Sequence, residues 1–161
     1  MDPDSLLDTA RLGAPRPLGT RPAVAATTGP LDGLLRVSGQ IAVSGGELMA
    51  TGKVGAQVDL GLARACARQC AINVLDVARQ RLGGLAGVRA VARLRVYVAS
   101  DPNFTDQHLV ADAATDLLHE VFGAVPHVRT ALGVAALPRD SPVEIDADLI
   151  LGVEAVRGSG E

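Results

Sequence analysis

The fold is decided by PHVRTALGVAALPRDSPVEIDADLIL, residues 126–151. From residue 143 to residue 149, apolar and acidic side chains alternate, as they do in a strand with one buried face. Residues 127–137 predict a second strand. Its apolar face would carry Val128, Leu132 and Val134, and its other face would carry Arg129, Ala131 and Gly133. The last two predicted elements are therefore strands, joined by a short loop.

Towards the N-terminus the period of the apolar residues changes twice. Residues 93–98 alternate and predict a further strand, whereas residues 57–82 and 106–122 repeat with the period of a helix and are followed by glycines. Residues 34–43, with Gly45 and Gly46 after them, predict a β-hairpin. The order strand, strand, helix, strand, helix, strand, strand predicts an α+β fold, a mixed sheet with two helices packed on one face.

The composition limits the classes of function. A chain of 161 residues forms one domain, and 48% hydrophobic with only 2% aromatic residues predicts an aliphatic core. A net charge of −3 and the lack of an aromatic surface speak against nucleic acid as a partner. No apolar run reaches the length of a membrane span, so we expect no membrane association. Cys66 and Cys70 lie four apart in a predicted helix and are expected to be buried thiols.

The chain divides into three parts. Four prolines interrupt the first 22 residues, so residues 1–21 are predicted to be a Pro-rich N-terminal arm, residues 22–153 the domain, and residues 154–161 a C-terminal tail. The N-terminus is acidic and does not resemble a signal peptide, which favours a cytoplasmic protein. Lys53 is the only lysine, a bias typical of a GC-rich bacterial genome.

One face of the predicted sheet is charged. The residues assigned to it are Arg93, Arg95, Tyr97, Arg129, Glu144, Asp146 and Asp148. Such a face needs either water or a second subunit with matching charges, and acids and bases can also pair across neighbouring strands. Oligomerisation through this face is the favoured interpretation, and a solvated face on a monomer is the alternative.

Several motifs resemble those of the RidA/YjgF family of imine and enamine deaminases. The most specific are SGQ at residues 38–40 and the pattern R-x-x-x-x-V-x-x-L-P-x-x-x-x-V-E-I-D-A from Arg129 to Ala147. The resemblance runs from about residue 22 to residue 153. Together with the length, VASDPNF at residues 98–104 is more similar to the longer branch of the family than to its compact members.

The resemblance implies a chorismate-mutase-like fold, a homotrimer, and ligand sites between subunits that need no cofactor. Arg129 matches the arginine that binds the substrate carboxylate, a task suited to a planar and permanently charged guanidinium. Glu144 matches the acid that positions water. Ser38 and Gly39 match the loop that shapes the pocket. The alternative role for Arg129 is a structural ion pair with Glu144 or Asp146 on an adjoining strand.

Three positions depart from the family pattern. Ala25 and Ala131 stand where relatives often have Tyr and Cys, and Asp112 stands where many have Asn. If Asp112 faces the substrate site, a second anion near Arg129 would oppose a simple 2-iminocarboxylate and favour a substrate with a cation or an extra donor. If Asp112 is exposed, it has no such role.

The histidines do not predict a metal site. His108, His119 and His127 lack the spacing of two ligands on one helix face, and they are expected at the surface. Only His127 stands out, because it shares a strand face with Arg129.

Three functions remain open. The first is hydrolysis of a small reactive imine or enamine to a carbonyl compound and ammonia, by Arg129 and Glu144 with Ser38 and Gly39 shaping the pocket. The second is a non-catalytic trimeric module that binds small carboxylates, and the third is a divergent tailoring step of secondary metabolism on the same fold. Ribonuclease activity is disfavoured, because the acidic chain lacks a basic, aromatic surface.

Overall fold

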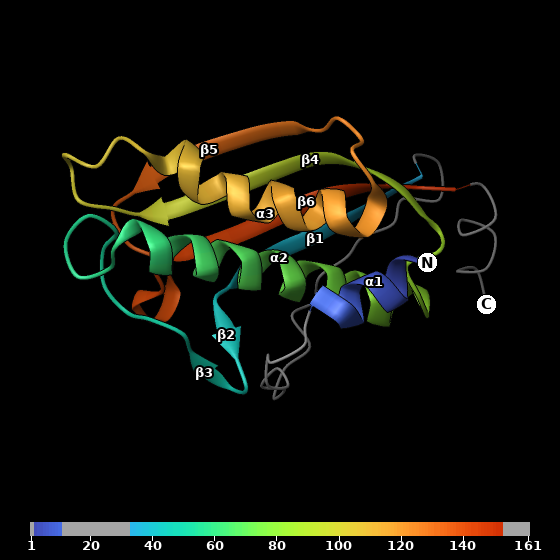
Figure 1. Ribbon diagram of the computed structural model, residues 1–161, viewed down its shortest axis with the longest axis horizontal. Coiled ribbons are helices and arrows are strands. Elements are labelled where there is room, and N and C mark those ends of the chain that lie inside the picture. Colours follow the sequence, from blue (N-terminus) through green and yellow to red (C-terminus); the bar gives the residue numbers. More distant parts are fainter. Residues whose placement is uncertain (1, 11–32, 153–161) are drawn as a thin grey trace.

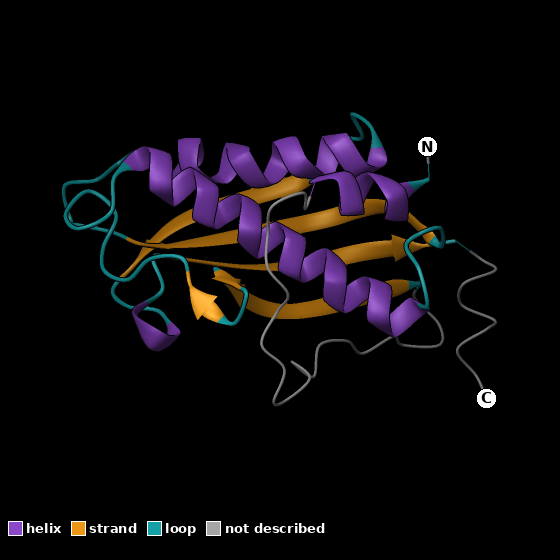
Figure 2. Cartoon of the chain, turned by 60° about the horizontal axis from the view of Figure 1, so that its bottom comes forward, coloured by secondary structure: helices purple, strands orange, loops and turns teal. Residues whose placement is uncertain are grey.

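A mixed sheet with two long helices on one face forms the body of the protein (Figures 1 and 2). The structure is a computed structural model and describes residues 2–10 and 33–152. Its helices and strands are α1 (Pro3–Ala10), β1 (Leu34–Ile41), β2 (Val43–Ser44), β3 (Glu47–Leu48), α2 (Leu60–Leu82), β4 (Val88–Ala99), α3 (Gln107–Phe122), β5 (Val128–Val134), the 3-10 turn η1 (Pro138–Asp140) and β6 (Val143–Leu151). The predicted α+β architecture is confirmed.

The strands of the main sheet follow the order β1-β6-β4-β5. β6 pairs antiparallel with both β1 and β4, and β4 pairs in parallel with β5 through the crossover helix α3. The last strand of the chain is therefore central, whereas β1 and β5 are the edges. β4 separates β5 from β6, and this decides which candidate residues can meet.

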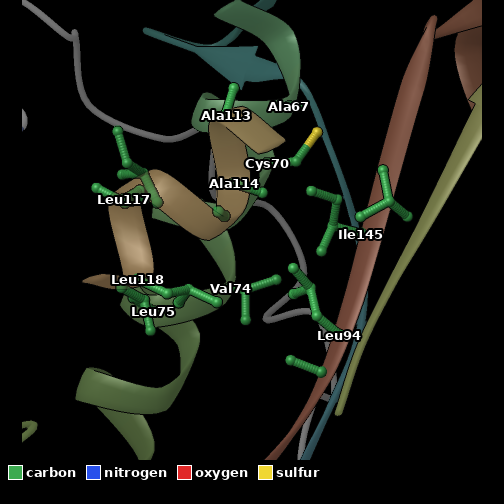
Figure 3. Close-up of a cluster of buried hydrophobic side chains, with 14 of the residues drawn as sticks. Ala67, Cys70, Val74, Leu75, Leu94, Ala113, Ala114, Leu117, Leu118 and Ile145 are labelled. Carbon is green, nitrogen blue, oxygen red and sulfur yellow. The ribbon is translucent and has the colours of Figure 1, made fainter. Parts of the chain in front are cut away.

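The core between sheet and helices is aliphatic, as the composition predicted. Val74 and Cys70 of α2, Leu117 of α3, and Leu94 and Ile145 of the sheet point into one cluster (Figure 3). The thiols of Cys66 and Cys70 are buried, which confirms the expectation for them, and burial raises the pKa of Cys66 to about 11. Burial also raises the pKa of Cys70, so both thiols are protonated near neutral pH.

Helix α2 ends at the predicted glycine and begins at Leu60, slightly after the predicted residue 57. The side chain of Asp59 accepts a hydrogen bond from the backbone N–H of Leu62 at 2.8 Å, so it caps the N-terminus. Gly83 ends the helix with a φ of 72°, a left-handed conformation that favours glycine. The predicted hairpin is also present, but it is the small pair β2–β3 around Gly45 and Gly46, while β1 joins the main sheet.

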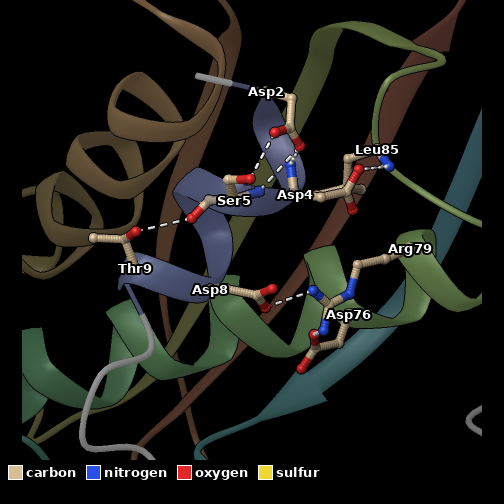
Figure 4. Close-up of polar contacts among 8 residues, drawn as sticks. All are labelled: Asp2, Asp4, Ser5, Asp8, Thr9, Asp76, Arg79 and Leu85. Carbon is tan, nitrogen blue, oxygen red and sulfur yellow. Dashed lines mark hydrogen bonds and ion pairs between the residues drawn. The ribbon is translucent and has the colours of Figure 1, made fainter.

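The predicted irregular arm is wrong for residues 3–10, which form the helix α1. Asp2 caps it, accepting hydrogen bonds from the backbone of Asp4 and Ser5 at 3.1 Å each (Figure 4). The helix packs against α2 and α3, Leu7 is fully buried, and Asp8 forms an ion pair with Arg79 of α2 at 2.6 Å. Proline at the first helical position costs no hydrogen bond, so the prolines did not exclude this helix. The rest of the predicted arm and the C-terminal tail lie outside the described residues.

Among the described residues, no helix combines the length and apolarity needed to cross a bilayer.

Candidate functional site

Arg129 lies on the edge strand β5, directly across from Leu94 of β4. Its Nη1 donates hydrogen bonds to Oδ1 of Asp112 at 2.8 Å and to Oγ1 of Thr115 at 3.0 Å, both on α3. Because Leu94 points into the core beneath the helices, Arg129 is on the helix-covered side of the sheet. The strand and the helix together hold the guanidinium in one orientation.

The rest of the Arg129 guanidinium is available. Nη1 uses both of its hydrogens on Asp112 and Thr115. No atom of residues 2–10 or 33–152 accepts a hydrogen bond from Nη2 or Nε, and 26% of the side chain is exposed. The Nη2–Nε edge presents two parallel N–H groups, the geometry that binds a carboxylate with two charge-assisted hydrogen bonds.

The face assigned to β5 from the sequence is wrong. Arg129 is on the helix side, and Val128 and Leu132, predicted to point into the core, are 56% and 50% exposed. Both faces of this strand carry apolar residues, since Ala131 shares the side of Arg129. The polarity of its residues therefore does not determine which face of β5 points to the helices. The pairing of β5 with β4 determines it.

The predicted structural ion pair for Arg129 is also wrong. β5 is not adjacent to β6, and Arg129 pairs with Asp112 rather than with Glu144 or Asp146. Asp112 lies beside Arg129, and 41% of its side chain is exposed.

Thr115 links the Arg129 guanidinium to His127. Its Oγ1 accepts from Arg129 and lies 3.3 Å from Nε2 of His127, so its own hydrogen can be donated to a neutral imidazole. Burial lowers the pKa of His127 below its usual 6.5, and the nearby His119 and Arg129 lower it further, against a backbone contact at Val125 that raises it. The ring centroids of His119 and His127 are 6.0 Å apart. The predicted proximity of His127 to Arg129 is thus confirmed, and it is partly buried rather than a plain surface residue.

We expect stability to fall as the pH drops through the range in which His127 titrates. Its folded pKa lies below 6.5, so between these two values the unfolded chain binds more protons, and folding weakens as pH falls. Thermal unfolding measured from about pH 7.5 to about pH 5 should show a shallower loss of Tm for His127→Gln than for the wild type. His108→Gln, at an exposed position, is the matched control. Identical pH slopes for the wild type and His127→Gln would contradict the assignment.

Glu144 lies on the opposite side of the sheet from Arg129. We call this side, which α2 and α3 leave uncovered, the open face. Glu144 is across from Tyr97 of β4 and Ile41 of β1. Burial raises the pKa of Glu144, and the neighbouring Asp146 raises it further. A carboxylate with a raised pKa is a stronger base near neutral pH than an ordinary one.

Gly39 makes room for the Glu144 carboxyl group. A Cβ atom on Gly39 would lie 1.8 Å from Oε1 and 2.7 Å from Cδ of Glu144. The carboxyl group therefore lies directly against the backbone of the bulge between Val37 and Gln40. Ser38 is exposed beside it, and the amide of Gln40 donates to the carbonyl oxygens of Ser38 and Gly39 at 3.0 Å each. The predicted neighbourhood of Ser38, Gly39 and Glu144 is thus present in one chain.

Arg129 and Glu144 are not brought together within one chain. They lie on opposite faces of the sheet with β4 between their strands. Arg129 is across from Leu94 and Glu144 from Tyr97, about 10 Å further along β4 at the usual rise of a strand. A small molecule cannot contact both side chains of the same chain.

The comparisons with known proteins agree with this architecture. The model of the family described as Endoribonuclease L-PSP matches residues 22–150. The chain belongs to that family. This match confirms the resemblance inferred from the sequence motifs, and the YjgF gene product of E. coli and RidA of Psychrobacter, at 23% and 22% identity, share the fold.

Three relatives show how far the similarity extends. Protein TCP17 of Trypanosoma cruzi is 39% identical over 140 residues, which cover 85% of this chain and 88% of that protein. The Agrobacterium tumefaciens protein Atu1372, described as of unknown function, is 37% identical with a TM-score of 0.82 over 94% of each chain. A putative endoribonuclease of Shewanella oneidensis is 24% identical with a TM-score of 0.81, over 94% of this chain and all of the other, which shows the shared fold.

The sequence did not predict every polar contact of this L-PSP family member. Thr115, three residues after Asp112 and so on the same side of α3, was not singled out, although its spacing was a usable signal. On the open face, Arg95 pairs with both Asp146 and Asp148, and the Tyr97 hydroxyl donates to Asp146 at 3.0 Å. The predicted charged face is confirmed for these residues. In the described part of the chain, no group of three or more His, Cys, Asp or Glu side chains is arranged to hold a metal ion.

Proposed function

We propose that this protein hydrolyses small reactive imines or enamines that carry a carboxylate. The observation that carries the proposal is the Nη2–Nε edge of Arg129, partly exposed and held in one orientation by Asp112 and Thr115. This edge fits the substrate carboxylate. The family membership supports the proposal, because the resemblance to imine and enamine deaminases rests on Arg129 and Glu144.

The proposed reaction uses Glu144 to position the attacking water. Water adds to the carbon of the protonated C=N bond, and the carboxylate takes up a proton from it. The resulting carbinolamine then loses ammonia. For an imine, the oxygen of the water ends in the carbonyl product and its two hydrogens are balanced by the two that nitrogen gains in becoming NH3. An enamine first takes a proton at carbon, which gives the same protonated C=N bond, so neither substrate requires a cofactor. The raised pKa of Glu144, caused by burial and by the neighbouring Asp146, makes its carboxylate a stronger base than an ordinary one, which suits it to gain and return this proton.

We further propose that the working molecule is a homotrimer with sites between chains. One chain holds Arg129 and Glu144 on opposite faces of its sheet, so a second chain must supply one of them. The open face offers the contact surface. Its charges are paired within the chain through Arg95, Asp146 and Asp148, and Leu132 and Val128 are exposed beside them. Light scattering should therefore give about three times the mass of one chain.

The function is tested with imines made in place by an amino-acid oxidase. The wild-type protein is expected to accelerate the release of 2-keto acids and ammonia from several 2-imino acids, because Arg129 holds their common carboxylate. Arg89→Ala, which removes an exposed arginine of β4, should act like the wild type. Equal release with and without the protein, for every amino acid tried, would overturn the proposal and leave the carboxylate-binding module as the alternative.

A further inference from the structure

Asp112 accepts a hydrogen bond from the Arg129 guanidinium, which is the group proposed to bind the substrate carboxylate. Its Oδ1 accepts from Nη1 of Arg129 at 2.8 Å, while no described residue donates to its Oδ2. With 41% of its side chain exposed, the carboxylate is accessible next to the free edge of the guanidinium. Asp112 therefore adds a negative charge at the place where a substrate carboxylate would bind.

No other group around this pair adds a positive charge that would attract an incoming carboxylate. Arg129 and Asp112 together are neutral, and Thr115 is uncharged. His127 stays neutral near pH 7, because burial lowers its pKa below 6.5. Asp116, one turn further along α3, pairs with Arg64 of α2 at 3.6 Å. A ligand with only a carboxylate is thus repelled by Asp112, whereas one that also carries a cation is attracted by it.

We propose that Asp112 determines substrate specificity: the site takes imines that carry a carboxylate at one end and a positively charged ammonium or guanidinium group at the other. This inference rests on the proposed function of Arg129. The carboxylate binds the Nη2–Nε edge and the cation binds Asp112, which sits on the neighbouring Nη1. Carboxylates on adjacent edges of one guanidinium are about 6 Å apart, a distance that a chain of four or five bonds spans.

The alternative is that Asp112 merely orients Arg129, as Thr115 does. The two roles separate in Asp112→Asn, because the amide oxygen still accepts the hydrogen bond from Nη1 but the negative charge is lost. Thr115→Val removes an orienting contact without changing charge. Asp116→Asn removes one negative charge from the same helix and is the matched control.

The experiment compares 2-imino acids made in place from arginine and from citrulline, which have nearly the same shape and differ in the charge of the terminal group. We expect kcat/KM for the wild type to be at least about ten-fold higher with the arginine imine, the size of one charge-assisted hydrogen bond. In Asp112→Asn the ratio should fall close to one, partly through faster turnover of the citrulline imine. Asp116→Asn and Thr115→Val should keep the wild-type ratio.

The outcomes separate this inference from the proposed function. If both imines are hydrolysed but the wild type does not prefer the arginine imine, or if Asp112→Asn keeps the preference, Asp112 is not a specificity residue and the deaminase proposal stands. If neither these imines nor any other 2-imino acid is hydrolysed, the deaminase proposal fails, and calorimetry with arginine and citrulline themselves decides. Tighter binding of arginine that is lost in Asp112→Asn supports the inference. Equal binding or no binding of the two overturns it.

Discussion

A one-to-one mixture of two inactive variants, Arg129→Ala and Glu144→Gln, is expected to recover about a quarter of the wild-type activity after the trimers are dissociated and reassembled. Each variant alone should lose activity by a factor of about 10² or more, since one lacks the carboxylate-binding group and the other the base. In each mixed trimer, about one site in three combines the intact Arg129 of one chain with the intact Glu144 of its neighbour, and about three quarters of the reassembled trimers are mixed, so about one site in four is active overall.

The physical reason is the sheet order. β4 lies between the strand of Arg129 and the strand of Glu144, and the two side chains leave the sheet on opposite faces. A site that uses both therefore draws them from two chains. Both substitutions should leave the fold intact, because Arg129 is partly exposed at an edge strand and Gln keeps the shape of Glu.

The mixing itself must be controlled. Two differently tagged wild-type proteins, treated in the same way, should form mixed trimers in the expected proportions and keep full activity. If tagged variants mix but no activity returns, the two residues do not act across a subunit boundary, and the proposed arrangement of the site is wrong.

Replacing Gly39 by alanine is expected to abolish most of the activity while leaving the Tm nearly unchanged. The new Cβ would lie 1.8 Å from Oε1 of Glu144, so the carboxyl group must move away from its place. Gly39 does not have a positive φ, so alanine fits its backbone. The substitution therefore displaces the Glu144 side chain, which can turn towards the exposed face, and it leaves the packing of the core unchanged.

The test for Gly39 is a double-mutant cycle on kcat/KM. If alanine acts by displacing Glu144, adding Gly39→Ala to Glu144→Gln should cost little more than Glu144→Gln alone. Gly152→Ala is the matched control, because a Cβ there meets its nearest neighbour, the Arg89 side chain, at an ordinary 3.5 Å. Fully additive losses, or a wild-type rate for Gly39→Ala, would show that Glu144 does not need its place against Gly39.

Much of the local structure follows from the sequence because it depends on neighbouring residues. Alternation over residues 143–149 predicted β6, and the helical period of residues 57–82, with Gly83 after them, predicted α2 and its end. The SGQ motif and the Arg129-to-Ala147 pattern led to the correct family. Of the four residues predicted to share a site, Ser38, Gly39 and Glu144 lie together because a bulge in β1 faces the start of β6, whereas Arg129 of the same chain lies on the other face.

The two errors share a physical cause. The sequence pattern of a helix or strand does not specify which other helix or strand it packs against. Helix α1 was missed because eight residues with little helical stability of their own depend on burying Leu7 against α2 and α3. The face of β5 was assigned wrongly because an edge strand with apolar residues on both sides can satisfy its polarity either way.

The sequence by itself determined the main elements after α1, their order, the aliphatic core and the family, because periodicity, helix-ending glycines and motif spacing are local properties. Only the tertiary structure decided that Arg129 lies beneath α3 with Asp112 and Thr115, on the side of the sheet away from Glu144. Register between β4 and β5 and the packing of α3 set that arrangement. These are contacts between residues far apart in the chain, and no local pattern specifies them.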